Sequence, residues 1–251
     1  MDVGVTHEGV ARLVREAGTV VALSGAGISV PSGIPDFRSP GTGLWADVNP
    51  MEVAHIDAWR RDPERFWSFY DQRFQTLEGK EPNGAHHALV ELERRGLLRA
   101  VVTQNIDGLH RAAGTRSLVE VHGTIATSSC LECGSSAPLE EVRRRIAEAP
   151  DGVPRCEDCA APLKPDVVLF GELLPVEAIE RAQTLCATAD VLLCIGTSLE
   201  VHPVAALPAL THAAGGDVVI ITKGSTSWDD RARYRLDGDV VEELDALVAA
   251  L

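Results

Sequence analysis

Four of the six cysteines stand in two closely spaced pairs. Cys130 and Cys133 form one Cys-x-x-Cys pair and Cys156 and Cys159 the other, with 22 residues between the pairs. Four thiolates can close a tetrahedral shell around Zn²⁺ with no position open for a substrate, which is typical of a structural ion. We therefore predict one structural zinc ion held by these four residues. Disulfide bonds are the alternative, although six cysteines in 251 residues are too few for a disulfide scaffold.

A glycine-rich string follows the first apolar run of the chain. It reads Ser-Gly-Ala-Gly-Ile-Ser over residues 24–29. Gly25 and Gly27 would let the backbone approach a phosphate closely, and a following helix amino terminus could receive the negative charge. The dinucleotide fingerprint has a third glycine where this chain has Val30. On its own the string therefore fits either a nucleotide site or a tight turn without a ligand.

His122 has a distinctive context among the eight histidines. It follows an apolar, extended-looking run over residues 118–121 and precedes Gly123, so we expect it at a strand end, facing a cleft. An imidazole titrates near neutral pH and suits proton abstraction. His122 is therefore a candidate general base, whereas we expect a structural role for His110.

Tyr70 and Arg73 are three residues apart within an aromatic stretch over residues 66–73. On a helix, side chains with this spacing can face one pocket. A guanidinium and a phenol together could bind a carboxylate through charge-assisted hydrogen bonds. The alternative is a helix-surface arginine beside a packing tyrosine.

The elements that must position these residues alternate between strands and helices. Short β-branched or apolar runs predict buried strands of a parallel sheet over residues 20–23, 100–103, 166–170, 191–195 and 217–221. Apolar residues spaced three or four apart predict helices over residues 85–95, 176–188 and 240–251. This alternation predicts an α/β fold with a Rossmann-like, doubly wound parallel sheet covered on both faces.

Two stretches interrupt the alternation. Residues 36–81 are rich in Pro, Gly, Trp and Phe, and residues 125–163 carry the cysteine pairs. We predict that they form a small inserted domain with a helical part and a zinc-binding part. The remaining segments, 1–35, 82–124 and 164–251, then form a Rossmann-like nucleotide-binding domain, with a cleft between the two.

Composition restricts the classes of partner. The formal charge of −14 argues against unaided binding to nucleic acid, which also disfavours a zinc-dependent nucleic-acid module. An acidic surface could attract lysine-rich protein segments, or it could simply favour solubility. No run approaches the roughly 18 apolar residues that span a bilayer, and the first residues lack the pattern of a signal peptide. We expect no membrane partner and a cytoplasmic location.

Several strings, in a fixed order, carry a family resemblance over roughly residues 20 to 205. Together with the glycine-rich string they resemble the sirtuin family of NAD-dependent protein-lysine deacylases. The strings are Gly33-Ile34-Pro35-Asp36-Phe37-Arg38-Ser39, Gly43-Leu44-Trp45, Thr103-Gln104-Asn105-Ile106-Asp107-Gly108-Leu109-His110, Val121-His122-Gly123, Val168-Leu169-Phe170-Gly171-Glu172 and Gly196-Thr197-Ser198-Leu199.

The resemblance implies NAD as a consumed co-substrate and acylated lysine-containing proteins as partners. It implies a cofactor site built from Gly25, Ala26, Gly27, Asp36, Phe37, Arg38, Gln104, Asn105, Asp107, Gly196, Thr197 and Ser198. It places Val168, Phe170 and Gly171 in the substrate groove, and it makes His122 the base that takes a proton from a ribose hydroxyl. The implied products are nicotinamide, 2′-O-acyl-ADP-ribose and free lysine.

The acyl group is a separate question. The Tyr70 and Arg73 pair resembles that of the sirtuin subgroup that removes acidic acyl groups, so we expect desuccinylation or demalonylation. Deacetylation alone is one alternative, and mono-ADP-ribosyl transfer with the same NAD cleavage is another. An ordinary NAD oxidoreductase would explain only the glycine-rich string and the sheet. The sequence departs from the family at Thr222-Lys223, where an Asn near the adenosine ribose is usual.

Overall fold

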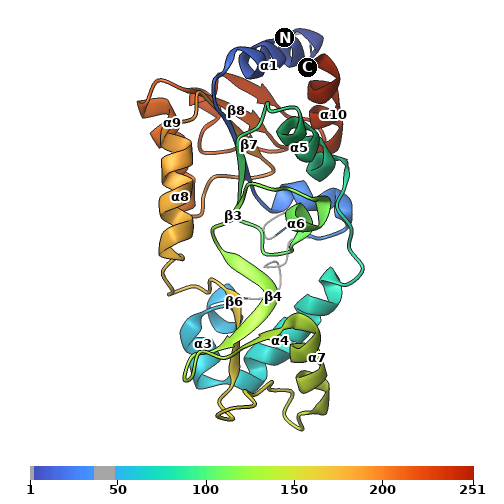
Figure 1. The fold of residues 1–251 in the computed structure, drawn as a ribbon, viewed down its shortest axis with the longest axis vertical. Helices are drawn as coiled ribbons and strands as arrows, with labels where there is room; N and C mark the ends of the chain where they lie inside the picture. The colour runs from blue at the N-terminus through green and yellow to red at the C-terminus, as the bar shows by residue number, and fades with distance from the viewer. Residues whose placement is uncertain (1–2, 37–48) are drawn as a thin grey trace.

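A six-stranded parallel sheet forms the larger part of the computed structural model, which describes residues 3–36 and 49–251 (Figure 1). The strand order is β3-β2-β1-β7-β8-β9. Chain order therefore reverses between β1 and β7, which makes their carboxyl ends the switch point where open α/β sheets bind ligands. The strands are β1 (Val20–Ser24), β2 (Ala100–Thr103), β3 (Leu118–Glu120), β7 (Val191–Ile195), β8 (Asp217–Ile221) and β9 (Tyr234–Leu236).

Helices cover both faces of this sheet, which confirms the predicted doubly wound architecture. Val20 and Ala22 of β1 pack in one aliphatic core, and Val21 and Leu23 pack in the other, as the period of two in a strand requires. One face is covered by α1 (Val3–Glu16), α5 (Gly84–Arg94) and α10 (Val240–Ala250), and the other by α8 (Val176–Ala187) and α9 (Leu207–Ala213) (Figure 1). The three predicted helices are confirmed to within one residue at each end.

Shorter elements connect these layers. They are α6 (Leu109–Ala113) and the 3₁₀ helices η1 (Ala26–Ser32), η2 (Val204–Ala206) and η3 (Asp229–Arg231). The glycine-rich string thus enters a 3₁₀ helix rather than a longer α-helix. Within the described ranges, no helix has the length and apolar character needed to cross a membrane.

A second, smaller unit lies at the end of the molecule opposite the chain termini (Figure 1). We call it the small module. Its antiparallel sheet has the order β5-β4-β6, and its core is dominated by aromatic side chains of α4. The module consists of α2 (Pro50–Val53), α3 (Ile56–Arg61), α4 (Pro63–Leu77), β4 (Gly123–Cys130), β5 (Ser136–Pro138), α7 (Leu139–Glu148) and β6 (Leu163–Val167). An inserted module is as predicted, and the domain boundaries given above stay predictions.

The strand predicted over residues 166–170 is wrong in both position and partner. β6 begins at Leu163, ends at Val167 and pairs antiparallel with β4 of the small module, for example Lys164 opposite Ser129. The apolar character of this run reflects burial against the aromatic core, not membership of the parallel sheet. Burial alone cannot distinguish the two, because both environments select the same residue types.

Candidate active site

The glycine-rich string packs directly against the loop that follows β7. The Gly25 N–H donates to the Ile195 carbonyl at 3.0 Å, and the Gly27 N–H donates to the Gly196 carbonyl at 2.8 Å. A Cβ on Gly196, whose φ is 59°, would lie 2.3 Å from the Ile28 nitrogen, so no larger residue fits there. The predicted cofactor residues from the two loops therefore meet at the switch point of the sheet.

Gln104 ties the loop after β2 to the same place. Its backbone N–H donates to the Ser24 carbonyl at 3.0 Å, and its side-chain amide donates to the Thr197 hydroxyl at 2.9 Å. The Gln104 carbonyl is 2.9 Å from Nδ1 of His122. One residue thus joins the glycine-rich string, the loop after β7 and the candidate base.

Asn105, Asp107 and Ser29 form a compact polar cluster beside Gln104. The Asn105 amide donates to the Gly25 carbonyl at 3.2 Å and to the Ser29 oxygen at 3.1 Å. The Ser29 hydroxyl donates to Asp107 Oδ2 at 2.7 Å, and Asp107 Oδ1 caps α6 by accepting from the Leu109 N–H at 2.9 Å. Ser29 is missing from the predicted site. The signal for it was a hydroxyl closing the glycine-rich string.

His122 lies between β3 and β4, at the junction of the parallel sheet and the small module. A carbonyl can only accept, so Nδ1 of His122 donates its proton to the Gln104 carbonyl, and Nε2 keeps a lone pair. Burial lowers the pKa of His122 below its usual 6.5, and the bond to Gln104 partly opposes that shift. The imidazole is therefore neutral at pH 7 and can act as a base through Nε2.

The segment after β6 carries the predicted substrate residues and is bonded to both units. The Val168 N–H donates to the His122 carbonyl at 2.8 Å. The backbone N–H and carbonyl of Phe170 are both bonded to residues 54–56, and the Phe170 side chain is 44% exposed. Gly171 has a φ of 84°, and a Cβ there would lie 2.7 Å from the imidazole of His55. The substrate segment is thus hydrogen-bonded to the backbone of the candidate base His122 and to the small module.

Tyr70 and Arg73 lie on helix α4, which confirms the predicted helical spacing, and both side chains are buried. The Tyr70 ring stacks on Phe66 at 4.4 Å between centroids. Burial raises the pKa of Tyr70 strongly, Arg73 opposes this shift and the Glu172 carboxylate adds to it. Burial lowers the pKa of Arg73, which Tyr70 and Asp107 oppose. At neutral pH the phenol keeps its proton and the guanidinium keeps its charge.

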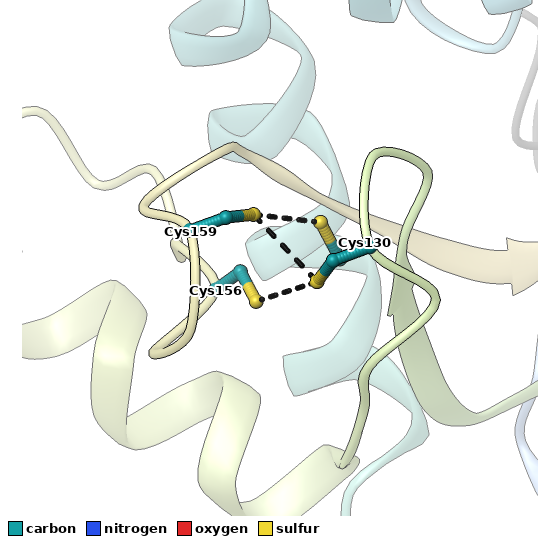
Figure 2. Close-up of side chains that lie close together, drawn as sticks. Cys130, Cys156 and Cys159 are labelled. Carbon is teal, nitrogen blue, oxygen red and sulfur yellow. Dashed lines mark hydrogen bonds between the residues drawn. The ribbon is translucent and has the colours of Figure 1, made fainter.

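The four predicted zinc ligands converge, and Figure 2 labels three of them. All four thiol sulfurs lie within 4.8 Å of one another, and the cysteines are free of disulfides. Sγ of Cys130 is 3.4 Å from Sγ of Cys159, and Sγ of Cys133 is 3.5 Å from Sγ of Cys156. Zn–S bonds of about 2.3 Å in a tetrahedron place sulfurs roughly 3.8 Å apart, so the set fits one structural Zn²⁺.

The two cysteine turns have the same backbone geometry. Gly134 donates to the Cys130 carbonyl at 2.9 Å, and Ala160 donates to the Cys156 carbonyl at 3.0 Å. Gly134 and Ala160 both have a positive φ, at 79° and 61°. Such paired turns present two sulfurs each to a shared centre. The remaining cysteines, Cys186 and Cys194, are buried as expected, and burial raises the pKa of Cys186 to about 12.

Some predicted residues contribute less to this picture. Phe37 and Arg38 lie outside the described residues, as does the string Gly43-Leu44-Trp45. Asp36 is partly buried at the edge of the described range, and Ser198 is partly buried beside Thr197.

Thr222 and Lys223 follow β8, where the sequence departs from the family pattern. Thr222 is buried, and Lys223 forms an exposed ion pair with Asp239 at 3.1 Å.

The whole chain is similar to known proteins. The model of the Sir2 family matches residues 25–203. The chain is 43% identical over 228 residues to an NAD-dependent protein deacetylase of Caldivirga maquilingensis, covering 91% of this chain and 87% of the relative. A solved Sir2 structure with a deacetylated p53 peptide and 3′-O-acetyl ADP ribose has a TM-score of 0.93 at 37% identity, covering 97% and 98% of the two chains.

A second solved structure, of Sir2 with a p53 peptide and NAD⁺, has a TM-score of 0.89 at 37% identity and covers 96% of each chain. Both the sequence match and the structural match thus extend over nearly the full length of the chain. The chain belongs to the Sir2 family.

Proposed function

We propose that the chain removes acyl groups from lysine side chains of proteins, consuming NAD as co-substrate, and that it favours acyl chains ending in a carboxylate. The observation that carries the chemistry is the setting of His122. Its Nδ1–H is bonded to the loop of Gln104, its Nε2 has a lone pair, and its backbone carbonyl is bonded to the segment of Val168. A neutral base is thus joined to both the proposed cofactor site and the proposed substrate segment.

NAD fits the residues at the carboxyl ends of β1, β2 and β7 in kind. The Gly25–Gly27 backbone can approach a pyrophosphate closely. The Asn105 amide and the Asp107 carboxylate offer a donor and an acceptor for a carboxamide such as that of nicotinamide. The Sir2 relatives support this role, since one is named as NAD-dependent and one solved structure contains NAD⁺. In the proposed reaction the acyl oxygen would bond to the ribose carbon of NAD as the bond from that carbon to nicotinamide breaks, and His122 Nε2 would accept the proton of a ribose hydroxyl.

The acyl preference rests on Tyr70 and Arg73. Both side chains are buried on α4, where a protonated phenol and a guanidinium can together bind a carboxylate. A charge-assisted pair of this kind in a low-dielectric pocket would discriminate strongly between succinyl and a neutral chain of equal length.

Four free zinc-binding thiols suit a reducing compartment, so a cytoplasmic location is part of the proposal.

The test uses purified protein, NAD and matched acetyl-lysine and succinyl-lysine peptides, with products followed by mass spectrometry. We expect both peptides to be deacylated and kcat/KM to be higher for succinyl. His122→Ala should lower turnover of both by about 10²–10⁴-fold, because the base is lost. The exposed His87→Ala is the matched control and should retain activity.

Arg73→Met separates the acyl preference from the chemistry. It should reduce succinyl turnover by at least about tenfold more than acetyl turnover, because only succinyl needs the guanidinium. Equal losses for both peptides would refute the preference and leave a deacetylase. ADP-ribose attached to a protein, with no acylated ADP-ribose in solution, would instead indicate a mono-ADP-ribosyltransferase.

A further inference from the structure

Lys164 is a buried cation on β6, just before the substrate segment. Only 7% of the residue is exposed. Its ammonium donates to the Pro165 carbonyl at 3.0 Å and the Val167 carbonyl at 2.9 Å, and it pairs with Glu172 Oε2 at 2.9 Å. These contacts use all three donors of the ammonium. A buried charge costs several kcal/mol unless it is paired and hydrogen-bonded, so this arrangement depends on Glu172.

Glu172 closes the turn that carries the predicted substrate residues. Its Oε2 also accepts from the Leu169 N–H at 2.9 Å, and the Glu172 N–H donates to the Leu169 carbonyl at 3.0 Å. Phe170 and Gly171 lie inside this turn. The ion pair therefore stabilises this turn, because Glu172 Oε2 binds the Lys164 ammonium and the Leu169 N–H at the same time.

The same ion pair lies beside the helix of the proposed acyl pocket. The Leu163 carbonyl, one residue before Lys164, accepts from the Trp67 indole of α4 at 3.0 Å. Tyr70 follows Trp67 by one turn on α4 and packs in the same core as Val167 and Leu169. The contribution of Glu172 to the raised pKa of Tyr70 agrees with this placement. The Glu172 carboxylate is therefore near enough to raise the pKa of the phenol.

A carboxylate at this position poses a problem for an acidic acyl chain. Two like charges within several ångströms repel appreciably where water is partly excluded. We propose that Lys164 is a specificity-determining positioning residue, which neutralises Glu172 so that a carboxylate-bearing acyl chain can bind Tyr70 and Arg73 without repulsion. This inference rests on the proposed acyl preference.

We expect two single variants to change the preference for acidic acyl chains in opposite directions. Lys164→Met leaves Glu172 uncompensated, so it should disfavour acidic chains. Glu172→Gln keeps an oxygen acceptor for the Leu169 N–H but leaves Lys164 uncompensated, so it should favour them. The double variant removes both charges and should restore the discrimination of the unmodified protein. Damage to the fold alone would not produce opposite signs or this rescue.

The measurement compares a succinyl-lysine peptide with its neutral amide, the 4-amino-4-oxobutanoyl peptide, which has the same shape without the charge. We expect the succinyl-to-amide ratio of kcat/KM to fall about tenfold in Lys164→Met, because one uncompensated negative charge then repels the succinyl carboxylate where water is partly excluded. The ratio should rise in Glu172→Gln and return to the value of the unmodified protein in the double variant. Melting temperatures, measured alongside, report any loss of folding. An unchanged ratio, or a fall in both single variants, would overturn the inference.

A failure of the acyl preference can be distinguished from a failure of the role proposed for Lys164. If the unmodified protein deacetylates but does not turn over succinyl, the preference fails, and the two peptides are compared instead as inhibitors of deacetylation. The ratio of their inhibition constants must still shift in opposite directions in the two single variants. If the succinyl peptide does not inhibit at all, both the preference and the role of Lys164 are refuted.

Discussion

The parallel sheet and the small module are built from strands of different character. Every residue of β1 and β7 is buried, and the side chains alternate between two aliphatic cores. In β4, buried residues are interspersed with partly buried and exposed ones, and the module's core relies on aromatic rings and two of the cysteines. The sheet therefore has a large apolar core of its own, whereas the module needs additional ties.

The residues of the candidate site are divided between the sheet and the module in the same way. The residues proposed to hold NAD follow strands of the sheet and are fixed by backbone hydrogen bonds such as that from Gly27 to Gly196. The residues proposed to select the acyl chain, Tyr70 and Arg73, belong to the module. Perturbing the module should thus change catalysis and selection while the sheet persists.

Removal of the zinc site is the strongest test of this contrast. Cys156→Ser should abolish the one bound zinc ion, because three thiolates and an alcohol no longer close the shell. Structural zinc contributes apparent binding free energies of about 10–16 kcal/mol in small zinc-binding units, so the module should lose order. We expect deacylation to fall at least about 100-fold, with zinc content measured by elemental analysis.

Cys186→Ala on α8 is the matched control. That thiol is fully buried where α8 packs on the sheet, outside the small module, and its loss removes one small buried group, which should cost only about 1 kcal/mol of stability. Zinc content should stay at one ion per chain. Full activity of Cys156→Ser without bound zinc would show that the module does not depend on the metal.

The sequence was most informative where chemistry and local pattern coincide. The cysteine spacing predicted the metal site, and runs such as Val191–Ile195 predicted strands, because burial on both faces of a parallel sheet leaves a continuous apolar signal. The position of His122 between strands was also predictable from its neighbours. The predicted site residues that meet in space come from loops far apart in the sequence, and only the family resemblance grouped them.

Other features had no local signal. The run at 166–170 looks the same whether it pairs in the large sheet or with β4, because both partners are distant in sequence. Ser29 acts only through Asn105 and Asp107, 76 and 78 residues away. From its neighbours in the sequence, Lys164 would be taken for a surface lysine beside a proline, and only the fold shows its ion pair with Glu172. In each case the deciding partner is a tertiary contact.

Two tryptophans offer an intermediate test of how the module is tied together. The indoles of Trp59 on α3 and Trp67 on α4 both donate to the Leu163 carbonyl at 3.0 Å. In either Trp→Phe variant the carbonyl keeps one partner, whereas the double variant leaves it unsatisfied at a cost of about 1–3 kcal/mol. Urea unfolding should therefore show a double-variant loss that exceeds the sum of the single losses by about 1 kcal/mol.

A pair in the sheet provides the comparison. Val20 and Val218 pack in the two separate aliphatic cores, on opposite faces of the sheet. Their Val→Ala variants share no partner, so their effects should add to within about 0.5 kcal/mol. Additive tryptophan variants would mean that the two indoles do not share the carbonyl, and the contrast between module and sheet would lose its clearest energetic basis.

The smallest expected effect concerns pH, at the junction of the two units. Since burial between them lowers the pKa of His122, the neutral base persists below pH 6.5, and the acid limb of kcat/KM should have its midpoint below that value. At pH 6.5 more than half of the plateau activity should remain. A midpoint at or above pH 6.5 would mean that His122 is solvated and the units are not packed around it.

Unfolding must be separated from this titration. Burial lowers the pKa of His86 to about 4 and of His110 to about 3. The unfolded chain therefore binds protons that the folded chain excludes, so the free energy of unfolding falls as the pH drops below about 6.5. Tryptophan fluorescence at each pH identifies where the fold is retained. Within that range, a loss of activity reports protonation of the base, because the folded state keeps His86 and His110 neutral.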